Sequence, residues 1–420
     1  MIQFYFPDSV DVINPGYCFD EEEHDRKRKR IVSEAYPHEV YEQPPYDGML
    51  ISKAVVKTRY SMAQRQRLMR QGIRKFLRLD TPEREHIKVI GDCGAFTYRN
   101  DPEPPYSVDE VIDFYDDLGF DLGISLDHVI LGFEDEDESE YKIYPDSKKL
   151  EELAEFKRRQ DTTLRLAKEF LESCISRKVK FKPLGVAQGW SPSSYADAVE
   201  KLQEIGYDYI ALGGMVPLKT DEIESCLRKI EKIRKKDTKF HLLGISRIDE
   251  LREFEKFGVV SADSTAPLLQ AFKSDRDNFQ LNGDSFIALR VQQVGENNKV
   301  KKLVLSGAIS QDEARKLELD CMRLLKGFDQ GTASVEEVTE ALCQLEALIT
   351  QKPKIKNRPL YVRTLKEKPW RNCDCPICKE LGIHVVIFRG AERNRRRGFH
   401  NLYNYYSILK GKRTATTHHV

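Results

Sequence analysis

Short apolar runs alternate with longer amphipathic stretches of helical periodicity between residues 48 and 265. This alternation predicts βα units around a parallel sheet, because each strand is followed by a helix that covers one face of the sheet. Strands are expected at residues 49–56, 87–91, 122–126, 183–187, 207–212, 240–245 and 258–262. Helical runs between them include residues 148–175, 193–205 and 221–235. The fold class is therefore α/β, and seven such strands favour a closed (β/α)8 TIM barrel over an open sheet.

Polar residues and glycines recur where the predicted strands end. The sequences GDCGAF, DH, QGW, GGM and DST follow the second, third, fourth, fifth and seventh of these strands. In a parallel barrel the carboxyl ends of all strands meet at one rim, and barrel enzymes build their active sites there. The pattern thus predicts an active site at this rim.

The rest of the chain is expected to flank the barrel. Residues 310–350 predict a helical hairpin, because capping boxes at Ser310 to Glu313 and at Ser334 to Glu337 open two helices. The acidic run at 134–140 is interpreted as a solvated loop. The predicted division is an N-terminal extension at 1–47, a barrel catalytic core at 48–300, a helical insertion at 301–360 and a zinc-binding basic subdomain at 361–420.

The composition is that of a folded protein without a membrane anchor. The chain has 420 residues, 40% of them hydrophobic, and no stretch approaches the roughly 18 consecutive apolar residues of a membrane span. The N-terminus MIQFYFPDSVD lacks the basic and apolar regions of a secretion signal, so a cytoplasmic location is expected, in the host cytoplasm if the source is viral. Six of the nine cysteines stand alone, which argues against a disulfide framework.

A net charge of zero conceals an uneven distribution. Residues 351–420 carry 17 Lys and Arg against 4 Asp and Glu, and residues 1–350 carry the compensating negative excess. This basic segment predicts binding to a polyanion such as nucleic acid, with a merely solvated tail as the alternative. Arginines alternate with aromatic residues near its end, and the predicted nucleic-acid contacts are Arg393, Arg395, Arg396 and Arg397.

A C-x-C-x2-C motif followed by a histidine is the strongest local signal. Its side chains are Cys373, Cys375, Cys378 and His400. Three thiolates and one imidazole make the donor set of a closed tetrahedral zinc site, and four protein ligands leave no position for a water, so the ion would be structural. His384 competes as the fourth ligand, although it lies in the apolar run IHVVIF, and His418 and His419 are weaker alternatives.

Two carboxylates directly follow predicted strands, Asp92 and Asp263, and Asp127 is a third. A lone aspartate at such a position is often a helix cap. Several on one catalytic rim favour acid-base or nucleophilic chemistry instead. Paired carboxylates are the groups that cleave a glycosidic bond, because one can attack the sugar carbon while the other moves the proton.

Small and aromatic residues accompany these carboxylates. Gly94, Gly213 and Gly214 remove side chains where a planar base would enter, and Phe96 offers a stacking face. The alternatives are tight turns for the glycines and a core position for Phe96.

The motifs in their order resemble the tRNA-guanine transglycosylase superfamily. The resemblance rests on GDCGAF (91–96), GVAQG (185–189), YIALGGM (209–215), LLGI (242–245), GVVSADSTAP (258–267) and the cysteine motif with HNLYNYY (400–406). It implies exchange of guanine in a polynucleotide for a 7-deazaguanine without strand cleavage. By position, Asp263 matches the nucleophile and Asp92 the general acid/base.

The resemblance assigns further residues to the base and to the metal. Those that fall where the family reads the purine edge are Asp127, Gln188 and Gly214, and Gly213 is expected to bind the base beside them. Phe96 and Leu243 match its stacking faces. The three cysteines and His400 match its zinc ligands.

One departure from the family pattern concerns the base pocket: Ala95 replaces a glycine in the pocket floor, which is expected to tune which base fits. Another points to DNA as the polynucleotide, because Pro267 is followed by apolar residues where the tRNA enzymes carry arginines that read RNA. The N-terminal sequence FYFPDSVDVINP resembles the DNA-modifying branch, whose members place 7-cyano-7-deazaguanine or a relative into phage and bacterial DNA as protection against restriction.

Two alternatives remain open on the sequence. One is the same exchange on tRNA, and the other is a catalytically idle, zinc-stabilised subunit that binds nucleic acid. The expected partners are DNA, double-stranded or locally single-stranded, and the 7-deazaguanine base, with a homodimer or a helper protein as further possibilities and no membrane.

Overall fold

Eight parallel strands close into a barrel in the computed structural model, which describes residues 1–8, 10–29, 32–134, 147–352 and 355–411. The strands are β1 Gln3–Pro7, β4 Gly48–Ser52, β5 Lys88–Asp92, β6 Leu122–Ile124, β7 Lys182–Ala187, β8 Tyr209–Leu212, β9 Lys239–Leu242 and β10 Val259–Asp263. Around the barrel their order is β1, β10, β9, β8, β7, β6, β5 and β4, after which β4 pairs with β1. The predicted (β/α)8 fold is confirmed.

The strand that the sequence analysis did not find is β1. It lies in the predicted N-terminal extension, yet it pairs in parallel with β10 and β4 and closes the barrel, so that assignment was wrong for these residues. Its centre, Phe4 to Phe6, is a continuous buried run, as expected for a strand covered on both faces. Residues 11–45, which follow it, belong to another unit, so the usual βα alternation is missing at this point.

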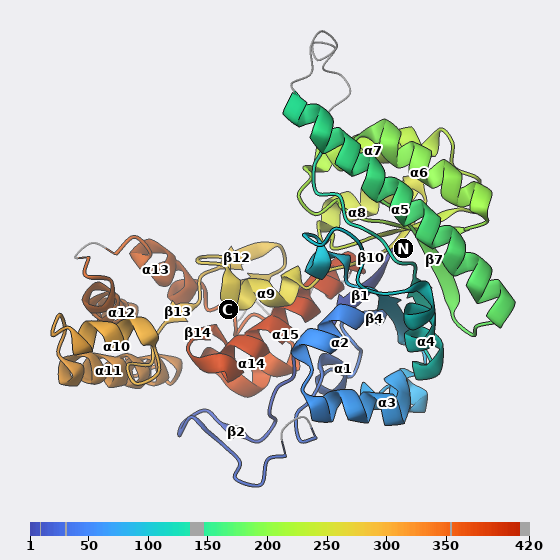
Figure 1. The fold of residues 1–420 in the computed structure, drawn as a ribbon. Coiled ribbons are helices and arrows are strands. Elements are labelled where there is room, and N and C mark those ends of the chain that lie inside the picture. The colour runs from blue at the N-terminus through green and yellow to red at the C-terminus, as the bar shows by residue number, and fades with distance from the viewer. Residues whose placement is uncertain (9, 30–31, 135–146, 353–354, 412–420) are drawn as a thin grey trace. The chain divides into compact units, whose positions relative to one another are not determined.

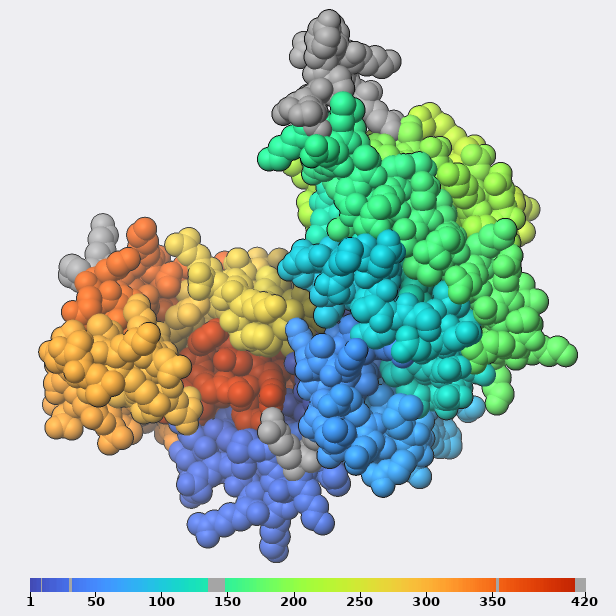
Figure 2. Space-filling model, in the orientation of Figure 1, coloured from blue at the N-terminus to red at the C-terminus, as the bar shows by residue number. Residues whose placement is uncertain are grey.

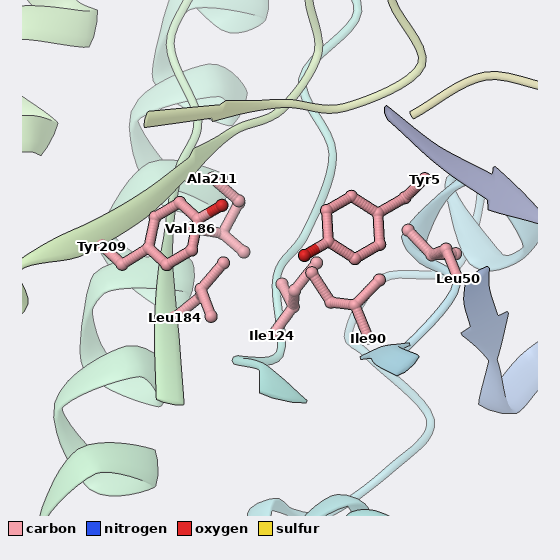
Figure 3. Close-up of a cluster of buried hydrophobic side chains, with 8 residues drawn as sticks. All are labelled: Tyr5, Leu50, Ile90, Ile124, Leu184, Val186, Tyr209 and Ala211. Atoms are coloured by element: carbon pink, nitrogen blue, oxygen red, sulfur yellow. The ribbon is translucent and has the colours of Figure 1, made fainter. Parts of the chain in front are cut away.

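Alternate strand residues fill the barrel interior (Figure 3). The buried cluster consists of Tyr5, Leu50, Ile90, Ile124, Leu184, Val186, Tyr209 and Ala211. In a barrel of eight strands the interior is just wide enough for side chains to fill it, so the strands enclose a packed core.

Helices surround the strands in the barrel unit, which comprises residues 1–10 and 46–265 (Figure 1). They are α2 Lys53–Arg59, α3 Met62–Phe76, α4 Val108–Leu118, α5 Ser147–Arg177, α6 Pro192–Ile205, α7 Thr220–Glu231 and α8 Ile248–Phe254, with short 3-10 turns η1 Pro82–Arg84, η2 Ala95–Tyr98 and η4 Glu255–Phe257. Their apolar faces pack on the strands and on neighbouring helices, as between α6 and α7.

The second unit comprises residues 11–45 and 266–420. Its helices are α1 Pro37–Val40, α9 Ala266–Lys273, α10 Asn298–Leu305, α11 Gln311–Asp329, α12 Val335–Thr350, α13 Arg358–Glu367, α14 Pro376–Leu381 and α15 Gly390–Leu409, with the turn η5 Gly382–Val386. Its short strands are β2 Tyr17–Cys18, β3 Glu23–His24, β11 Phe279–Leu281, β12 Asp284–Phe286, β13 Leu289–Arg290 and β14 Ile387–Phe388. The two units differ from the predicted domain boundaries, because the break falls after Thr265 and the N-terminal segment is shared between them.

The predicted helical hairpin corresponds to α11 and α12, which pack against each other. Ser310 and Ser334 cap these helices by accepting hydrogen bonds from the backbone N–H groups of Glu313 and Glu337. No helix in the described ranges combines the length and apolar character that crossing a membrane requires. The acidic run, apart from Glu134, lies outside the described residues, as do the alternative metal ligands His418 and His419.

Candidate active site and metal centre

The predicted catalytic and base-binding residues lie on one rim of the barrel. Asp92 is the last residue of β5, and Asp263 is the last residue of β10. Four others follow β6, β7, β8 and β9 within three residues of the strand ends: Asp127, Gln188, Gly213 and Leu243. Because the strands are parallel, these six neighbouring strand ends meet at the same rim, where barrel enzymes carry their active sites.

Asp263 is held through one of its two carboxylate oxygens. The residue is only 6% exposed. Its Oδ1 lies 3.0 Å from Nε2 of His241 and accepts a hydrogen bond of 3.1 Å from the backbone N–H of Gly244. The other oxygen, Oδ2, makes no hydrogen bond within the part of the chain that the structure describes. That oxygen is therefore available to an incoming group, while Oδ1 fixes the orientation of the carboxylate.

His241 is fully buried and links Asp263 to two hydroxyl groups. Its Nδ1 lies 2.6 Å from Oγ of Ser261, which lies 2.5 Å from the hydroxyl oxygen of Tyr209. One tautomer satisfies all three contacts: Nε2–H donates to Asp263, and Nδ1 accepts from Ser261, whose oxygen accepts from Tyr209.

His241 is not among the residues predicted from the sequence, because a histidine in the apolar run FHLL is typical of a core position. The signal that could have found it is the spacing of Ser261 and Asp263. Residues two apart on a strand point to the same face, and Ser261 pairs with His241 on the neighbouring strand.

The carboxyl of Asp92 sits in an environment that favours its neutral form. Burial raises its pKa to about 7, and the negative charges of Asp127 and Asp263 act in the same direction. The backbone N–H of Gly94 and the hydroxyl of Ser52 oppose the shift by stabilising the ionised form. A carboxyl with a pKa near neutrality can both give and take a proton at the same pH, as a general acid/base must.

Asp127 and Gln188 form a buried polar pair beside Asp92. The Gln188 amide Nε2–H donates to Oδ2 of Asp127 at 2.6 Å, and the Cys93 thiol donates to Oδ1 at 3.1 Å. Tyr98 donates its hydroxyl to the Cys93 sulfur at 3.0 Å. Burial raises the pKa of Asp127 to about 6, against the effect of the two hydrogen bonds. The network fixes both carboxylate oxygens and leaves little rotational freedom at this side chain.

Two glycines after β8 allow the backbone to approach this pair closely. A Cβ at Gly213 would lie 2.2 Å from Nε2 of Gln188, and one at Gly214 would lie 2.4 Å from the carbonyl oxygen of Ile130. Gly214 also has a φ of +74°, which side-chain-bearing residues rarely adopt. Any larger residue here would displace Gln188 and with it Asp127.

The predicted stacking residues differ in exposure. Phe96, in η2, is 63% exposed, so it is not a core residue, and the Arg99 guanidinium lies 4.6 Å from its ring centre. Leu243 is partly buried and packs on the barrel core cluster. Gly94 precedes η2 with a φ of +89°, and a Cβ there would lie 2.4 Å from the Ser52 hydroxyl oxygen. Their contact with a base remains a prediction.

In the second unit the four predicted metal ligands come together in a buried cluster. Its members are Cys373, Cys375, Cys378 and His400, and their ligand atoms all lie within 4.8 Å of one another. Nδ1 of His400 lies 3.5, 3.4 and 3.3 Å from the three sulfur atoms in turn. Tetrahedral zinc with Zn–S of about 2.3 Å and Zn–N of about 2.0 Å places sulfur and nitrogen roughly 3.5 Å apart. The donor set and its spacing therefore fit that ion.

Contacts around His400 orient it toward the cluster. Its Nε2 lies 2.7 Å from the carbonyl oxygen of Gln280, which assigns the proton to Nε2 and leaves Nδ1 free to bind a metal. Its ring stacks on Phe279 at 3.9 Å. The competing ligand His384 lies elsewhere, with Nδ1 at 3.4 Å from the Arg393 guanidinium.

The prediction that four arginines of α15 contact nucleic acid is wrong for three of them, because those three are buried. Arg393, Arg396 and Arg397 are at most 1% exposed. Arg397, for example, donates to the carbonyl oxygens of Ala271, Val385 and Ile387. Only Arg395 of the four retains a partly exposed side chain, at 31%. Sequence alone did not reveal that this helix, α15, is a core element whose charges pair inside the unit.

The fold and the two sites define the class of protein. A (β/α)8 barrel with two acidic residues and a glycine-lined polar pair on its catalytic rim, together with a Cys3His cluster, is the arrangement of tRNA-guanine transglycosylase-like enzymes. No protein-family model matches the chain. The chain is 46% identical over 417 residues, 97% of each chain, to a DNA-guanine transglycosylase of Salmonella montevideo. The protein belongs to that family, the DNA-modifying branch of the class.

Proposed function

We propose that the protein exchanges guanine in DNA for a 7-deazaguanine, with 7-cyano-7-deazaguanine as the expected incoming base. One observation carries the proposal. Asp263, with one uncommitted carboxylate oxygen, shares a catalytic rim with Asp92, whose pKa is about 7. Base exchange without strand cleavage needs such a nucleophile and such a proton carrier. The similarity to a DNA-guanine transglycosylase supports DNA as the polynucleotide.

The target guanine must first leave the duplex, because its glycosidic bond is not reachable inside the stack. Unstacking costs a few kcal/mol, roughly, and aromatic or apolar contacts to the extruded base offset part of it. Phe96 and Leu243 take this stacking role. Asp127, Gln188 and the backbone at Gly214 read the edge of the purine.

In the first half-reaction Oδ2 of Asp263 attacks C1′ of the deoxyribose. The C1′–N9 bond breaks, its electron pair goes to the departing guanine, and protonated Asp92 supplies the proton that neutralises it. A covalent ester joins Asp263 to C1′, and Asp92 is left as a carboxylate.

In the second half-reaction that carboxylate takes the N9 proton of the incoming 7-deazaguanine. N9 then attacks C1′, and the ester bond breaks with return of its electron pair to Asp263. Both aspartates regain their starting states, so the cycle needs no redox cofactor and no nucleotide. The product in DNA would resist restriction enzymes that read guanine.

His241 acts as a positioning residue for this chemistry. Its Nε2–H occupies Oδ1 of Asp263, so the reactive oxygen is Oδ2 in both half-reactions. The Ser261 hydroxyl fixes the tautomer that makes this donation possible.

The Cys3His cluster holds a structural zinc ion in this proposal. Cys373, Cys375, Cys378 and His400 occupy all four positions of a tetrahedron, so no water can be activated there. The ion stabilises the fold of the second unit and takes no part in the exchange.

Trapping the covalent intermediate tests the proposal. Guanine-containing DNA is mixed with the protein in the absence of an incoming base, and a denaturing gel followed by mass spectrometry of peptides locates any adduct. We expect a protein–DNA ester on Asp263 that Asp263→Asn abolishes and that the matched variant Asp237→Asn, in the exposed loop before β9, retains. An adduct on another residue, or one that persists in Asp263→Asn, would refute the assigned nucleophile.

A further inference from the structure

The chain between residues 53 and 78 is strongly basic. It contains nine Lys and Arg and no Asp or Glu, in a protein whose total charge is balanced. These residues form α2 and α3 of the barrel unit. The segment is less conspicuous in the sequence than the larger positive excess at the C-terminus, on which the prediction of nucleic-acid binding rested.

Most of these charges form no ion pair, although Lys53 and Lys57 act electrostatically on Glu110 of α4. Arg74 pairs with Asp121 at 3.3 Å. Six others form no ion pair with any residue in the described ranges, and we call them the α2–α3 basic surface: Lys57, Arg59, Arg65, Arg67, Arg70 and Lys75. Elsewhere in the barrel unit arginines are commonly paired, as Arg158 is with Glu155. Clustered positive side chains without ion-pair partners create a local positive potential that attracts a polyanion.

The α2–α3 basic surface is open to solvent. Lys57, Arg59, Arg70 and Lys75 are exposed, and Arg65 and Arg67 are partly exposed. In Figure 2 the segment is the medium-blue region near residue 60 on the bar, and it faces the viewer over a broad area. Met62 and Met69 are also exposed between the charges, at 63% and 61%.

This surface begins at the catalytic rim. α2 starts directly after β4, whose last residue, Ser52, is paired in register with Asp92. The backbone N–H of Ala54 donates to the carbonyl oxygen of Cys93 at 3.3 Å, and Gly94 packs on Ser52 and Ala54. A polynucleotide that lies along α2 and α3 therefore passes the end of β5, which carries the proposed general acid/base.

The dimensions suit several phosphates. α3 is interrupted at Gly72, where φ is 74°, so its first part spans residues 62–71. At about 1.5 Å per residue that part is roughly 15 Å long, and B-DNA advances about 3.4 Å per base pair. Three or more phosphates of one strand can thus meet the cations of this surface.

We propose that the α2–α3 basic surface is where the DNA backbone docks while the target base enters the barrel rim. The proposal rests on the function proposed above, since it takes DNA as the polynucleotide. It assigns the electrostatic part of DNA binding to the barrel unit and away from the buried arginines of α15.

Two triple variants test the proposal. The docking variant carries Arg59→Gln, Arg67→Gln and Arg70→Gln. The control variant removes the same charge from exposed residues at the opposite end of the barrel, between the end of α7 and the first residue of β9, through Lys232→Gln, Lys236→Gln and Lys239→Gln. All six side chains are at least partly exposed, so the thermal midpoints of both variants should lie within about 5 °C of the wild-type value. Thermal melts check this first.

The readout is the Kd for a guanine-containing duplex, measured by fluorescence anisotropy at several salt concentrations. For the docking variant we expect Kd to rise on the order of tenfold near 0.1 M salt, and the slope of log K against log salt to shrink by about 3. The control variant should keep the wild-type slope. Equal Kd values and slopes for the two variants would overturn the proposal, and so would a loss confined to tRNA binding.

Labelling of DNA with radioactive guanine by the same wild-type preparation separates this proposal from the function on which it rests. If wild type labels DNA while the two variants bind DNA equally, the docking surface is wrong and the function stands. If the docking variant alone loses DNA binding but wild type never labels DNA, the surface stands and the proposed exchange fails.

Discussion

Asp263 accepts both of its hydrogen bonds on a single oxygen, and this asymmetry decides which atom can react. Oδ1 is occupied by His241 and by the Gly244 backbone, and Oδ2 is left for the sugar carbon. Without the imidazole the carboxylate could rotate and present either oxygen at a less favourable angle. Positioning of this kind contributes to the rate, because even a small misplacement of a nucleophile slows the reaction strongly.

His241→Phe tests that role, since it keeps a ring in the same space and removes the donor. We expect kcat for base exchange to fall by roughly 10- to 100-fold, with KM for DNA changed by about twofold at most, because DNA contacts are untouched. Steady-state kinetics with labelled base give both constants, and a thermal melt checks the fold. Ser261→Ala, which keeps the imidazole, should lower kcat by a smaller factor. A higher KM with unchanged kcat in His241→Phe would argue against positioning.

Asp92 should impose a pH dependence on stability as well as on activity. Its pKa is about 7 in the folded protein, against 3.8 for an aspartate free in water, so folding favours the protonated form. Stability associated with this group is fully present below pH 3.8 and is lost as the pH rises through about 7. Asp92→Asn removes the ionisable group, and with it this loss of stability at higher pH. We expect it to abolish exchange and to raise the free energy of unfolding at pH 8 by on the order of 1 to 3 kcal/mol.

Urea unfolding of wild type and Asp92→Asn at pH 4 and pH 8 measures this effect. The two proteins should differ more at pH 8 than at pH 4. Equal differences at both pH values would show that the carboxyl is not shifted upward.

At the scale of secondary structure, the hydrophobic pattern predicts strands well where a helix follows each one. β5, β7 and β10 lie within a residue of the predicted runs, because their buried faces are continuous and their ends are marked by Gly, Gln or Asp. β4 is shorter than predicted, since residues 53–56 continue as helix α2. β1 escaped prediction because the segment between it and β4 belongs to the second unit and supplies no barrel helix. The strand-end pattern supplied the three aspartates and the glycines of the rim, and the resemblance added Gln188 and Leu243. His241 escaped because its polar partners, Ser261 and Asp263, lie on the neighbouring strand.

The basic sequence of α15 shows what composition cannot tell. A run of arginines reads as a surface for nucleic acid, yet in this helix the side chains turn inward and bond carbonyl oxygens and acidic residues. Arg396 contacts Glu392 and the carbonyl of Asn14, and Arg393 contacts Glu22. Burial of charge depends on partners far away in the sequence, and a local pattern does not contain them.

Arg397→Met should therefore act on stability. The arginine donates to three backbone carbonyl groups inside the second unit, and its removal takes that buried donor away from each of them. We expect a loss of about 2 to 4 kcal/mol in the free energy of unfolding, against about 0.5 kcal/mol or less for the partly exposed Arg395→Met. Urea titration of both variants provides the comparison. Similar losses for the two would contradict the structural role.

For the whole molecule, the two units differ in how far their positive charges are paired. The second unit pairs much of its positive charge internally and gathers four metal ligands, whereas the barrel unit carries the rim carboxylates and the unpaired cations of α2 and α3. The proposed chemistry and the proposed DNA contact thus both reside in residues of the barrel unit.

Metal content provides a test at this scale. The purified protein should contain about one zinc per chain, and Cys378→Ser should contain much less, because a structural tetrahedral site tolerates no missing ligand. Chelation should lower the thermal midpoint without changing where any covalent adduct forms. Mass spectrometry measures the zinc content of both proteins, and thermal melts measure their stability in parallel. A Cys378→Ser protein that keeps its zinc and its stability would rule out the assigned site.

The most direct test of the central claim is incorporation of labelled guanine or 7-cyano-7-deazaguanine into DNA and into tRNA, by wild type and by Asp263→Ala. We expect label in DNA with wild type, little or none in tRNA, and none in either with Asp263→Ala. Label confined to tRNA, or label in DNA that survives the loss of Asp263, would contradict that claim.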